Sequence, residues 1–304
     1  MTDIDNVKRQ VRDRTVKAAA SVGDRVGVAV GPHHFYSSVT NRRDLKGQDS
    51  WRRTFLPPGI DWDIDGQVRF FESIMTDSAR MTDADRAALN DLGRVGSGFG
   101  FVEAEFLFAY LRVQQPKRIV EIGSGETTSI MWRALRDVES EITAIDPYSS
   151  LPDIIRSDVT VRQEPLQVVT DDIIADLSEG DLLFIDSSHS VKTGSEVHLI
   201  YLDLLPRLKP GVRVHIHDIY MPYVHHPGLL EEDMWDWQET ALLVALLANS
   251  SKFEIDCALS GLAHERPDAL RRNIPGYIER PTDSGGLFTN SDGHFPASLY
   301  MHSK

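Results

Sequence analysis

Residues 118–128 read R-I-V-E-I-G-S-G-E-T-T, and the rest of the fold can be worked out from this stretch. The β-branched run in Arg118–Ile122 ends at Gly123, which predicts a strand followed by a tight turn. From Thr127 to Leu135 apolar residues recur at helical spacing, so a helix is expected directly after the turn. The stretch therefore predicts a strand, a glycine turn and a helix.

The glycine turn has the features of a ligand-binding turn. Gly123 and Gly125 lack the Cβ atoms that would keep a ligand away from the backbone, and the free N–H groups of the next helix point toward it. The spacing is similar to the dinucleotide fingerprint G-x-G-x-x-G, but Thr128 replaces the third glycine. Glu121 places a carboxylate where a pyrophosphate would approach, and two anions repel each other. This acid suits a ligand that is positively charged here, such as S-adenosylmethionine.

A second acid lies where a ribose would need one. Glu141–Asp146 reads E-I-T-A-I-D, and Asp146 ends this predicted strand 23 positions after Gly123. A ribose-binding carboxylate is expected about 20 residues after such a turn. The motif E-x-G-x-G with this acid resembles the class I S-adenosylmethionine-dependent methyltransferases, and the alternative is a tight turn with a solvated aspartate. The resemblance implies the cofactor-binding residues Glu121, Gly123, Ser124, Gly125, Thr127 and Asp146.

The composition limits the kinds of partner and the location that are expected. The 304 residues carry a formal net charge of −14 and no Lys/Arg cluster long enough to track phosphates, so nucleic acid is not expected as a partner. No apolar run approaches the ~20 residues of a membrane span, and the N-terminus lacks the pattern of a secretory signal. The single cysteine, Cys257, excludes an internal disulfide and a cysteine-built zinc site, so a cytoplasmic location is the default expectation.

Strand and helix patterns alternate after the glycine turn, which predicts an α/β, doubly wound fold with ligands at the carboxyl ends of parallel strands. Strands are expected at Arg118–Ile122, Ile142–Ile145, Val159–Arg162, Leu182–Ile185 and Val212–His217. Helices are expected within Gly98–Leu111 and at Thr127–Leu135, Leu166–Leu177, Thr193–Leu205 and Met234–Ala248. Phe253–Ala258 and Ser298–His302 are expected to form an antiparallel hairpin with no helix between them. The resemblance implies a mostly parallel, seven-stranded, Rossmann-like methyltransferase sheet.

Residues 1–97 are predicted to form an N-terminal extension, either a lid or a dimerisation segment, in front of a methyltransferase domain at residues 98–304. An extension of this size makes a homo-oligomer conceivable. His34 and Tyr36 lie in a histidine- and aromatic-rich segment that could fold over a pocket or form an ordinary packed loop. Glu103 and Glu105, in the helix before the glycine turn, are expected to be solvated or capping acids.

Acids and imidazoles follow two predicted strands. Asp186 and His189 come after one strand, and the next strand delivers His215, His217 and Asp218 to the same edge of the sheet. Methyl transfer needs an acceptor held in line and its proton removed, and an imidazole with an ordinary pKa near ~6.5 is suited to that role. His189 is therefore predicted to be the base, with Asp186 and Asp218 as orienting acids or ligands of a divalent metal. His215 and His217 are expected to pack within the sheet.

The positions of Asp186, His189 and Asp218 resemble the active-site pattern of metal-dependent O-methyltransferases related to the catechol and macrolide-sugar enzymes. In that pattern the two acids bind magnesium and the residue three after the first acid is the base, a histidine in the sugar enzymes. The acid or amide that usually follows the second metal ligand is Ile219 here, so Mg²⁺ or a similar ion stays an open expectation. Strand alternation is expected to point His217 away from Asp218.

The acceptor is expected to meet aromatic side chains. Tyr220, Tyr223 and Trp237 follow the last predicted parallel strand and suit stacking on a ring or sugar, although they could also be core aromatics. The expected function is methyl transfer from S-adenosylmethionine to a hydroxyl of a small secondary metabolite or sugar. The alternatives are a small-molecule N-methyltransferase, an NAD(P)-binding oxidoreductase and a non-catalytic nucleoside-binding protein.

Overall fold

The computed structural model describes residues 14–23, 25–27, 40, 45, 52–91, 98–225, 235–279 and 296–304. The chain forms two units, Met1–Asp49 and Ser50–Lys304. A helix over residues 14–23 is described in the first unit, and the second unit contains the sheet. The predicted boundary between residues 97 and 98 stays a prediction.

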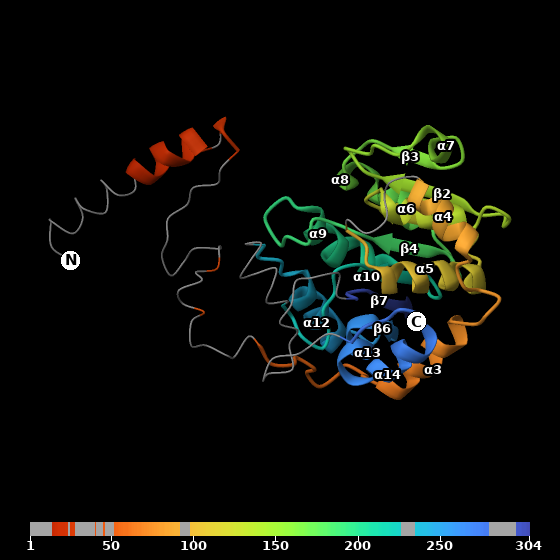
Figure 1. The fold of residues 1–304 in the computed structure, drawn as a ribbon. Helices are drawn as coiled ribbons and strands as arrows, with labels where there is room; N and C mark the ends of the chain where they lie inside the picture. Colours follow the sequence, from red (N-terminus) through yellow and green to blue (C-terminus); the bar gives the residue numbers. More distant parts are fainter. Residues whose placement is uncertain are drawn as a thin grey trace. The chain divides into compact units, whose positions relative to one another are not determined.

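Seven strands form a single sheet in the part of the chain that the structure describes, in the order β3-β2-β1-β4-β5-β7-β6 (Figure 1). The strands are β1 (Arg118–Ile122), β2 (Glu141–Ile145), β3 (Thr160–Arg162), β4 (Leu182–Ile185), β5 (Arg213–Ile216), β6 (Phe253–Ala258) and β7 (Leu299–Ser303). Strands β1 to β5 run parallel, whereas β7 is antiparallel to both β5 and β6. The predicted doubly wound sheet with an antiparallel end is confirmed.

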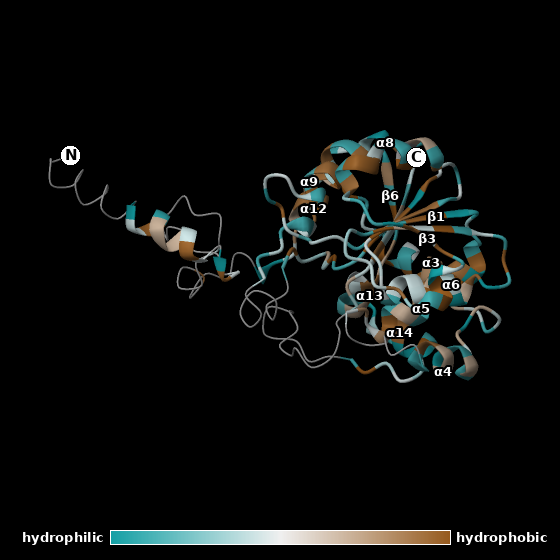
Figure 2. Ribbon diagram, turned by 90° about the horizontal axis from the view of Figure 1, so that it is seen from above, coloured by the Kyte–Doolittle hydropathy of each residue, from teal (hydrophilic) through white to brown (hydrophobic). Residues whose placement is uncertain are grey.

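Each face of the sheet packs on its own apolar core. Ile119 and Phe184 face one core, and their neighbours Val120 and Ile185 face the other, as strand alternation requires. Figure 2 shows the helices in two layers on either side of the strands. One layer holds α3 (Ile64–Ile74), α4 (Asp83–Asp91), α5 (Phe101–Gln114), α6 (Glu126–Ala134), α13 (Leu259–Glu265) and α14 (Pro267–Asn273). The other holds α8 (Leu166–Asp176), α9 (Glu196–Leu199), η2 (Ile200–Leu204), α10 (Leu205–Arg207) and α12 (Glu239–Asn249).

Two predicted connections differ from the structure. The prediction of a helix-free link between β6 and β7 is wrong, because α13 and α14 lie there. Leu259, Leu262 and Ala263 are buried at helical spacing, and Pro267 stands at the start of α14, where a missing N–H costs nothing. The helix predicted after β4 is broken into α9, the π-helical turn η2 and α10. Neither difference disturbs the antiparallel pairing of β7.

A buried acid ties α4 to α6 on the first layer. Both Thr82 N–H and Thr82 Oγ1 donate to Asp85 Oδ2, at 3.1 and 2.6 Å. Arg133 Nε and Arg136 donate to Asp85 Oδ1 at 2.8 and 2.7 Å. Burial by itself raises the pKa of Asp85, but these hydrogen bonds outweigh it and hold the pKa well below its usual range. Asp85 therefore stabilises the fold as a carboxylate.

Replacing Asp85 with alanine should lower the free energy of unfolding by about 1–3 kcal/mol, because hydrogen bonds to a charged, buried acceptor are lost. The depressed pKa fixes the sign of the pH dependence: the stabilisation is present above the unfolded-state pKa of about 3.9 and is lost as the pH falls below it. Urea unfolding at neutral pH and near pH 3 measures both effects. Asp77→Ala is the control, since Asp77 is fully exposed and its ion pair with Arg80 is long, at 3.6 Å. Equal effects of the two substitutions would contradict the prediction.

Candidate active site

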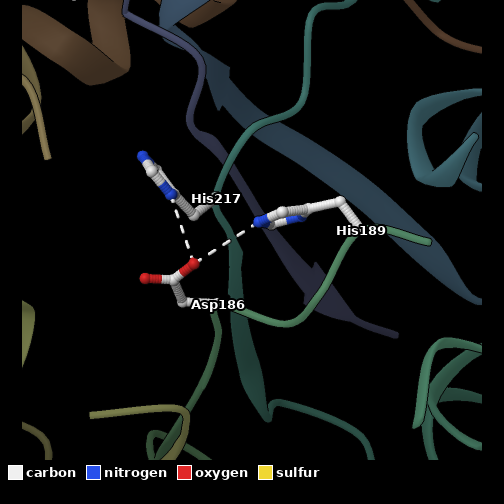
Figure 3. Close-up of side chains that lie close together, drawn as sticks. All are labelled: Asp186, His189 and His217. Atoms are coloured by element: carbon white, nitrogen blue, oxygen red, sulfur yellow. Dashed lines mark hydrogen bonds and ion pairs between the residues drawn. The ribbon is translucent and has the colours of Figure 1, made fainter. Parts of the chain in front are cut away.

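Two neighbouring parallel strands deliver the predicted catalytic side chains to one edge of the sheet. Strand β4 ends at Ile185 and β5 at Ile216, and the two residues are paired in register. Asp186 and His217 follow directly, so they lie side by side beyond the strand ends. Figure 3 shows the imidazoles of His189 and His217 pointing at the carboxylate of Asp186.

Four side chains, Asp186, His189, His217 and Asp218, form what we call the strand-end cluster. His189 Nε2 lies 3.5 Å from Asp186 Oδ1 and 3.4 Å from Asp218 Oδ2. His217 Nδ1 lies 3.4 Å from Asp186 Oδ1 and 3.5 Å from Asp218 Oδ2. The structure thus brings together Asp186, His189 and Asp218, as the sequence predicts.

The prediction that His217 points away from Asp218 is wrong. Asp218 has φ +54°, which is left-handed backbone and not a continuation of the strand. Side chains alternate only while the backbone stays extended. The turn at Asp218 therefore brings its carboxylate round to the imidazole of His217, which does not pack in the sheet as expected.

Two further acids hold the imidazoles from outside the cluster. His189 Nδ1 lies 2.7 Å from Glu239 Oε2, an oxygen that also accepts a hydrogen bond from Ser187 Oγ at 3.1 Å. His217 Nε2 lies 3.4 Å from Glu103 Oε1. Glu103 and Glu239 are each 1% exposed, so both carboxylates depend on protein partners for their solvation.

Sequence reasoning missed both outer acids. Glu103 was expected to be solvated or capping; it does accept from the Gly100 N–H at 3.1 Å, but it is buried against His217. Glu105 is also buried rather than solvated, and it pairs with Arg86 at 2.7 Å. Glu239 lies at the start of α12, and nothing near it in the sequence distinguishes it from a first-turn acid.

Charge within the cluster is balanced between acids and imidazoles. Burial lowers the pKa of His189, but the hydrogen bonds to Asp186 and Glu239 outweigh it and raise the pKa to about 10. His217 behaves in the same way: burial lowers its pKa, and nearby carboxylates, Asp218 first, raise it well above the usual value. With no cation bound, both imidazoles are protonated near neutral pH.

His215, two residues before His217, is a core residue. Its ring stacks on Phe184 with centroids 4.0 Å apart and meets the ring of Tyr300 edge-on at 4.6 Å. Neither ring nitrogen has a hydrogen-bond partner among the described residues, and burial lowers the pKa of His215 well below its usual value. The prediction that His215 packs within the sheet is confirmed.

Glu121 stabilises the glycine turn through hydrogen bonds to the first residues of the helix that follows it. This buried carboxyl accepts hydrogen bonds from Thr127 Oγ1 at 2.5 Å and from Thr128 Oγ1 at 2.6 Å. Thr128 Oγ1 also accepts from the Gly125 N–H at 2.8 Å, which explains a threonine at the third glycine position. Burial raises the pKa of Glu121 to about 8, so it carries little negative charge at neutral pH. Contact of Glu121 and Thr127 with a ligand stays a prediction.

Asp146 is joined to the glycine turn. Its Oδ2 accepts from Ser124 Oγ at 2.6 Å, and its Oδ1 accepts from the Tyr148 N–H at 2.8 Å. Gly123 has φ +105°, and a Cβ there would lie 2.6 Å from the backbone oxygen of Asp186. The turn therefore lies between the acid after β2 and the strand-end cluster after β4.

The predicted acceptor-binding aromatics lie in different places. Trp237 packs against His189 with ring centroids 4.5 Å apart, and Trp235 stacks on Trp237 at 4.9 Å. The hydroxyl of Tyr220 donates to Asp218 Oδ1 at 3.0 Å, whereas Tyr223 packs on His264 of α13 at 4.6 Å. The remaining two predicted residues, His34 and Tyr36, lie outside the described residues.

A comparison with known families finds a match for the middle of the chain. Residues 120–219 match a family model described as a methyltransferase domain. This part of the chain is a methyltransferase domain. The match runs from β1 to just beyond β5, so it includes the glycine turn and all four residues of the strand-end cluster. Together with the seven-stranded sheet and its antiparallel end, it identifies a class I, S-adenosylmethionine-dependent methyltransferase domain.

Solved structures give weaker matches to this chain. An O-methyltransferase from Bacillus cereus in complex with SAH is 15% identical, with 79% of this chain and 100% of that chain covered and a TM-score of 0.47. The O-methyltransferase TomG from Streptomyces achromogenes, in complex with SAM, is 14% identical, with coverage of 64% and 91% and a TM-score of 0.41. A putative O-methyltransferase from Klebsiella pneumoniae is 17% identical, with coverage of 57% and 80% and a TM-score of 0.40.

Two negative results complete the comparison. No curated protein matches this chain significantly. Of the helices in the described ranges, none has the length and apolar character that crossing a membrane requires.

Proposed function

We propose that the protein transfers the methyl group of S-adenosylmethionine to a hydroxyl of a small molecule. The observation that carries the proposal is the closeness of the glycine turn to the strand-end cluster. A Cβ on Gly123 would lie 2.6 Å from the carbonyl oxygen of Asp186, so a cofactor on the turn lies next to groups that can bind and deprotonate a hydroxyl. Positioning and proton removal are the two effects that methyl transfer to oxygen requires.

The cofactor is proposed to lie over Gly123, Ser124 and Gly125, with its ribose hydroxyls on Asp146. Asp146 already accepts two hydrogen bonds within the protein, from Ser124 Oγ and the Tyr148 N–H, and these fix its carboxylate at the end of β2. Glu121 and Thr127 are proposed to stabilise the glycine turn through the hydrogen bond between them.

His189 is proposed to be essential for the reaction together with the carboxylates around it. Its Nδ1 is held by Glu239 at 2.7 Å, and its Nε2 faces Asp186 and Asp218 at 3.5 and 3.4 Å. Both ring nitrogens therefore have anionic partners, and the imidazole is not an isolated base open to the acceptor. We propose that the proton of the acceptor hydroxyl is handled by this cluster as a unit.

The donor atoms do not fit magnesium. Mg²⁺ favours near-octahedral coordination by oxygen and keeps several water ligands. In the strand-end cluster the carboxylates of Asp186 and Asp218 face two imidazoles, and Ile219, fully buried and apolar, follows the second acid. The proposed methyl transfer therefore does not involve magnesium.

The acceptor is proposed to be a small hydroxylated compound with a planar ring or sugar. The stacked pair Trp235 and Trp237 lies beside His189, and Trp235 is 51% exposed. Exposed indoles next to a reactive group suit stacking on such an acceptor.

Asp146→Ala should weaken binding of S-adenosylhomocysteine by about 10- to 100-fold, because a carboxylate that receives charged hydrogen bonds is worth roughly 1.5–3 kcal/mol. Calorimetric titration of the purified protein measures this, and NADH is titrated separately. Asp153→Ala is the matched control, since Asp153 is exposed in the same region after β2. Binding of NADH in place of S-adenosylhomocysteine, or of neither, would overturn the proposed function.

A further inference from the structure

The strand-end cluster has separations that are longer than ordinary charged hydrogen bonds. Its four nitrogen–oxygen distances, between the imidazoles of His189 and His217 and the carboxylates of Asp186 and Asp218, are all 3.4 or 3.5 Å. Charged N–H···O hydrogen bonds are shorter, about 2.7–2.9 Å. In a tetrahedral metal site with ligand bonds of about 2.0–2.1 Å, neighbouring donor atoms lie about 3.3–3.4 Å apart. Each of these four nitrogen–oxygen separations matches the spacing of neighbouring ligands around a shared ion.

The outer acids give a second, independent indication. An imidazole that binds a metal ion ordinarily donates its other ring N–H to a carboxylate, which fixes its orientation. His189 has this arrangement, with Nδ1 2.7 Å from Glu239. His217 Nε2 faces a carboxylate in the same way but at a longer distance, 3.4 Å from Glu103. Glu103 is itself held by Ser298 Oγ at 2.6 Å. The remaining nitrogens, His189 Nε2 and His217 Nδ1, are left facing the two aspartates.

We infer that Asp186, His189, His217 and Asp218 bind a divalent transition-metal ion of the zinc class instead of magnesium. Two imidazoles with carboxylates are donors that Zn²⁺, Co²⁺, Fe²⁺ and Ni²⁺ favour, whereas Mg²⁺ favours oxygen alone. Among the described residues, one ligand atom from each of Asp186, His189 and His217 can be chosen so that all three lie within 4.8 Å of one another.

The inference deepens the proposed function and rests on it for the role of the ion. A zinc-class ion can add a fifth ligand and lowers the pKa of a bound hydroxyl, which is the chemistry that methyl transfer to oxygen needs. His189 is then a metal ligand held by Glu239, and not the base that the sequence predicts. The alternative is a cluster in which protonated imidazoles and carboxylates balance each other without an ion.

The test is a titration of the full-length protein, after EDTA treatment and removal of the chelator, with Co²⁺ under exclusion of air. Tetrahedral or five-coordinate Co²⁺ absorbs visible light strongly, and octahedral Co²⁺ absorbs weakly. We expect a saturable, intense visible spectrum at one ion per chain that Zn²⁺ abolishes and that a large excess of Mg²⁺ leaves unchanged. His217→Ala and Asp186→Asn should each abolish the spectrum, and Glu103→Gln should weaken binding about 10- to 100-fold.

His215→Phe is the matched control. It removes an imidazole from the same strand, one that has no hydrogen-bond partner among the described residues, so the cobalt spectrum should persist. Circular dichroism of every variant checks folding, and Asp186→Asn keeps the test valid if His217→Ala does not fold. A weak octahedral spectrum, competition by Mg²⁺ at equal concentration, or an unchanged spectrum in a folded His217→Ala protein would overturn the inference. S-adenosylhomocysteine titrated into the same metal-free samples tests the proposed function separately, because cofactor binding without cobalt binding refutes only the metal site.

Discussion

His189→Ala should lower the turnover number for methyl transfer by about 10²- to 10⁴-fold, the range that loss of a positioned proton-handling group produces. The affinity for S-adenosylhomocysteine should stay unchanged, because the glycine turn and Asp146 do not depend on this imidazole. The reason for the loss is that His189 Nε2 faces both Asp186 and Asp218, so the cluster loses its central partner. Single-turnover methyl transfer from S-adenosylmethionine, with calorimetry in parallel, measures the two quantities. The size of the effect is the same whether His189 acts as a base or as a ligand.

His302→Ala is the control for this substitution. His302 pairs with Asp256 at 2.8 Å. It also lies beside Arg213, the first residue of β5, whereas the cluster follows the last residue of β5. His302 is therefore at the opposite end of the strands from the cluster. It should leave turnover intact. If His189→Ala retains full turnover, the cluster is not the reaction site. If it also loses cofactor affinity, the effect is structural and the proposed role of His189 is refuted.

Much of the sheet could be predicted because its strands are buried on both faces. Arg118–Ile122, Leu182–Ile185 and Phe253–Ala258 were predicted with the same bounds that the structure has. The first two are short runs rich in β-branched, leucine or aromatic residues, and parallel strands covered by helices need such runs. Phe253–Ala258 is instead the antiparallel strand at the edge of the sheet. Polar residues directly after the strands could then be assigned to the carboxyl edge, which placed Asp186 and Asp218 correctly side by side.

The rest of the site depends on contacts that a strand pattern does not encode. Glu103 reaches His217 only because α5 packs across the sheet, and Glu239 reaches His189 because α12 begins above it. In the sequence, both acids look like solvated residues in the first turn of a helix. Strand alternation ends before Asp218, because the local turn gives this residue a positive φ. Backbone conformation after a strand, and long-range packing of helices, therefore limit prediction here.

Gly123→Ala should disturb both halves of the site. Gly123 has φ +105°, a conformation that costs a residue with a side chain about 1–3 kcal/mol, and its Cβ would lie 2.6 Å from the backbone oxygen of Asp186. That oxygen belongs to backbone that follows β4 directly, so it cannot move without displacing the Asp186 carboxylate. We expect the free energy of unfolding to fall by at least the strain energy, and binding of S-adenosylhomocysteine and methyl transfer to be lost together.

Urea unfolding and calorimetric titration of Gly123→Ala measure these losses, with Gly98→Ala as the matched control. Gly98 has no positive φ, and a Cβ there meets no atom of the described residues within 4 Å, so the same chemical change should leave stability and cofactor binding as they are. A Gly123→Ala protein that folds with normal stability but loses cofactor binding would place the whole effect on the ligand's access to the turn. A Gly123→Ala protein that keeps both normal stability and cofactor binding would mean that the backbone after β4 can shift freely. The proposed link between the glycine turn and the strand-end cluster would then be refuted.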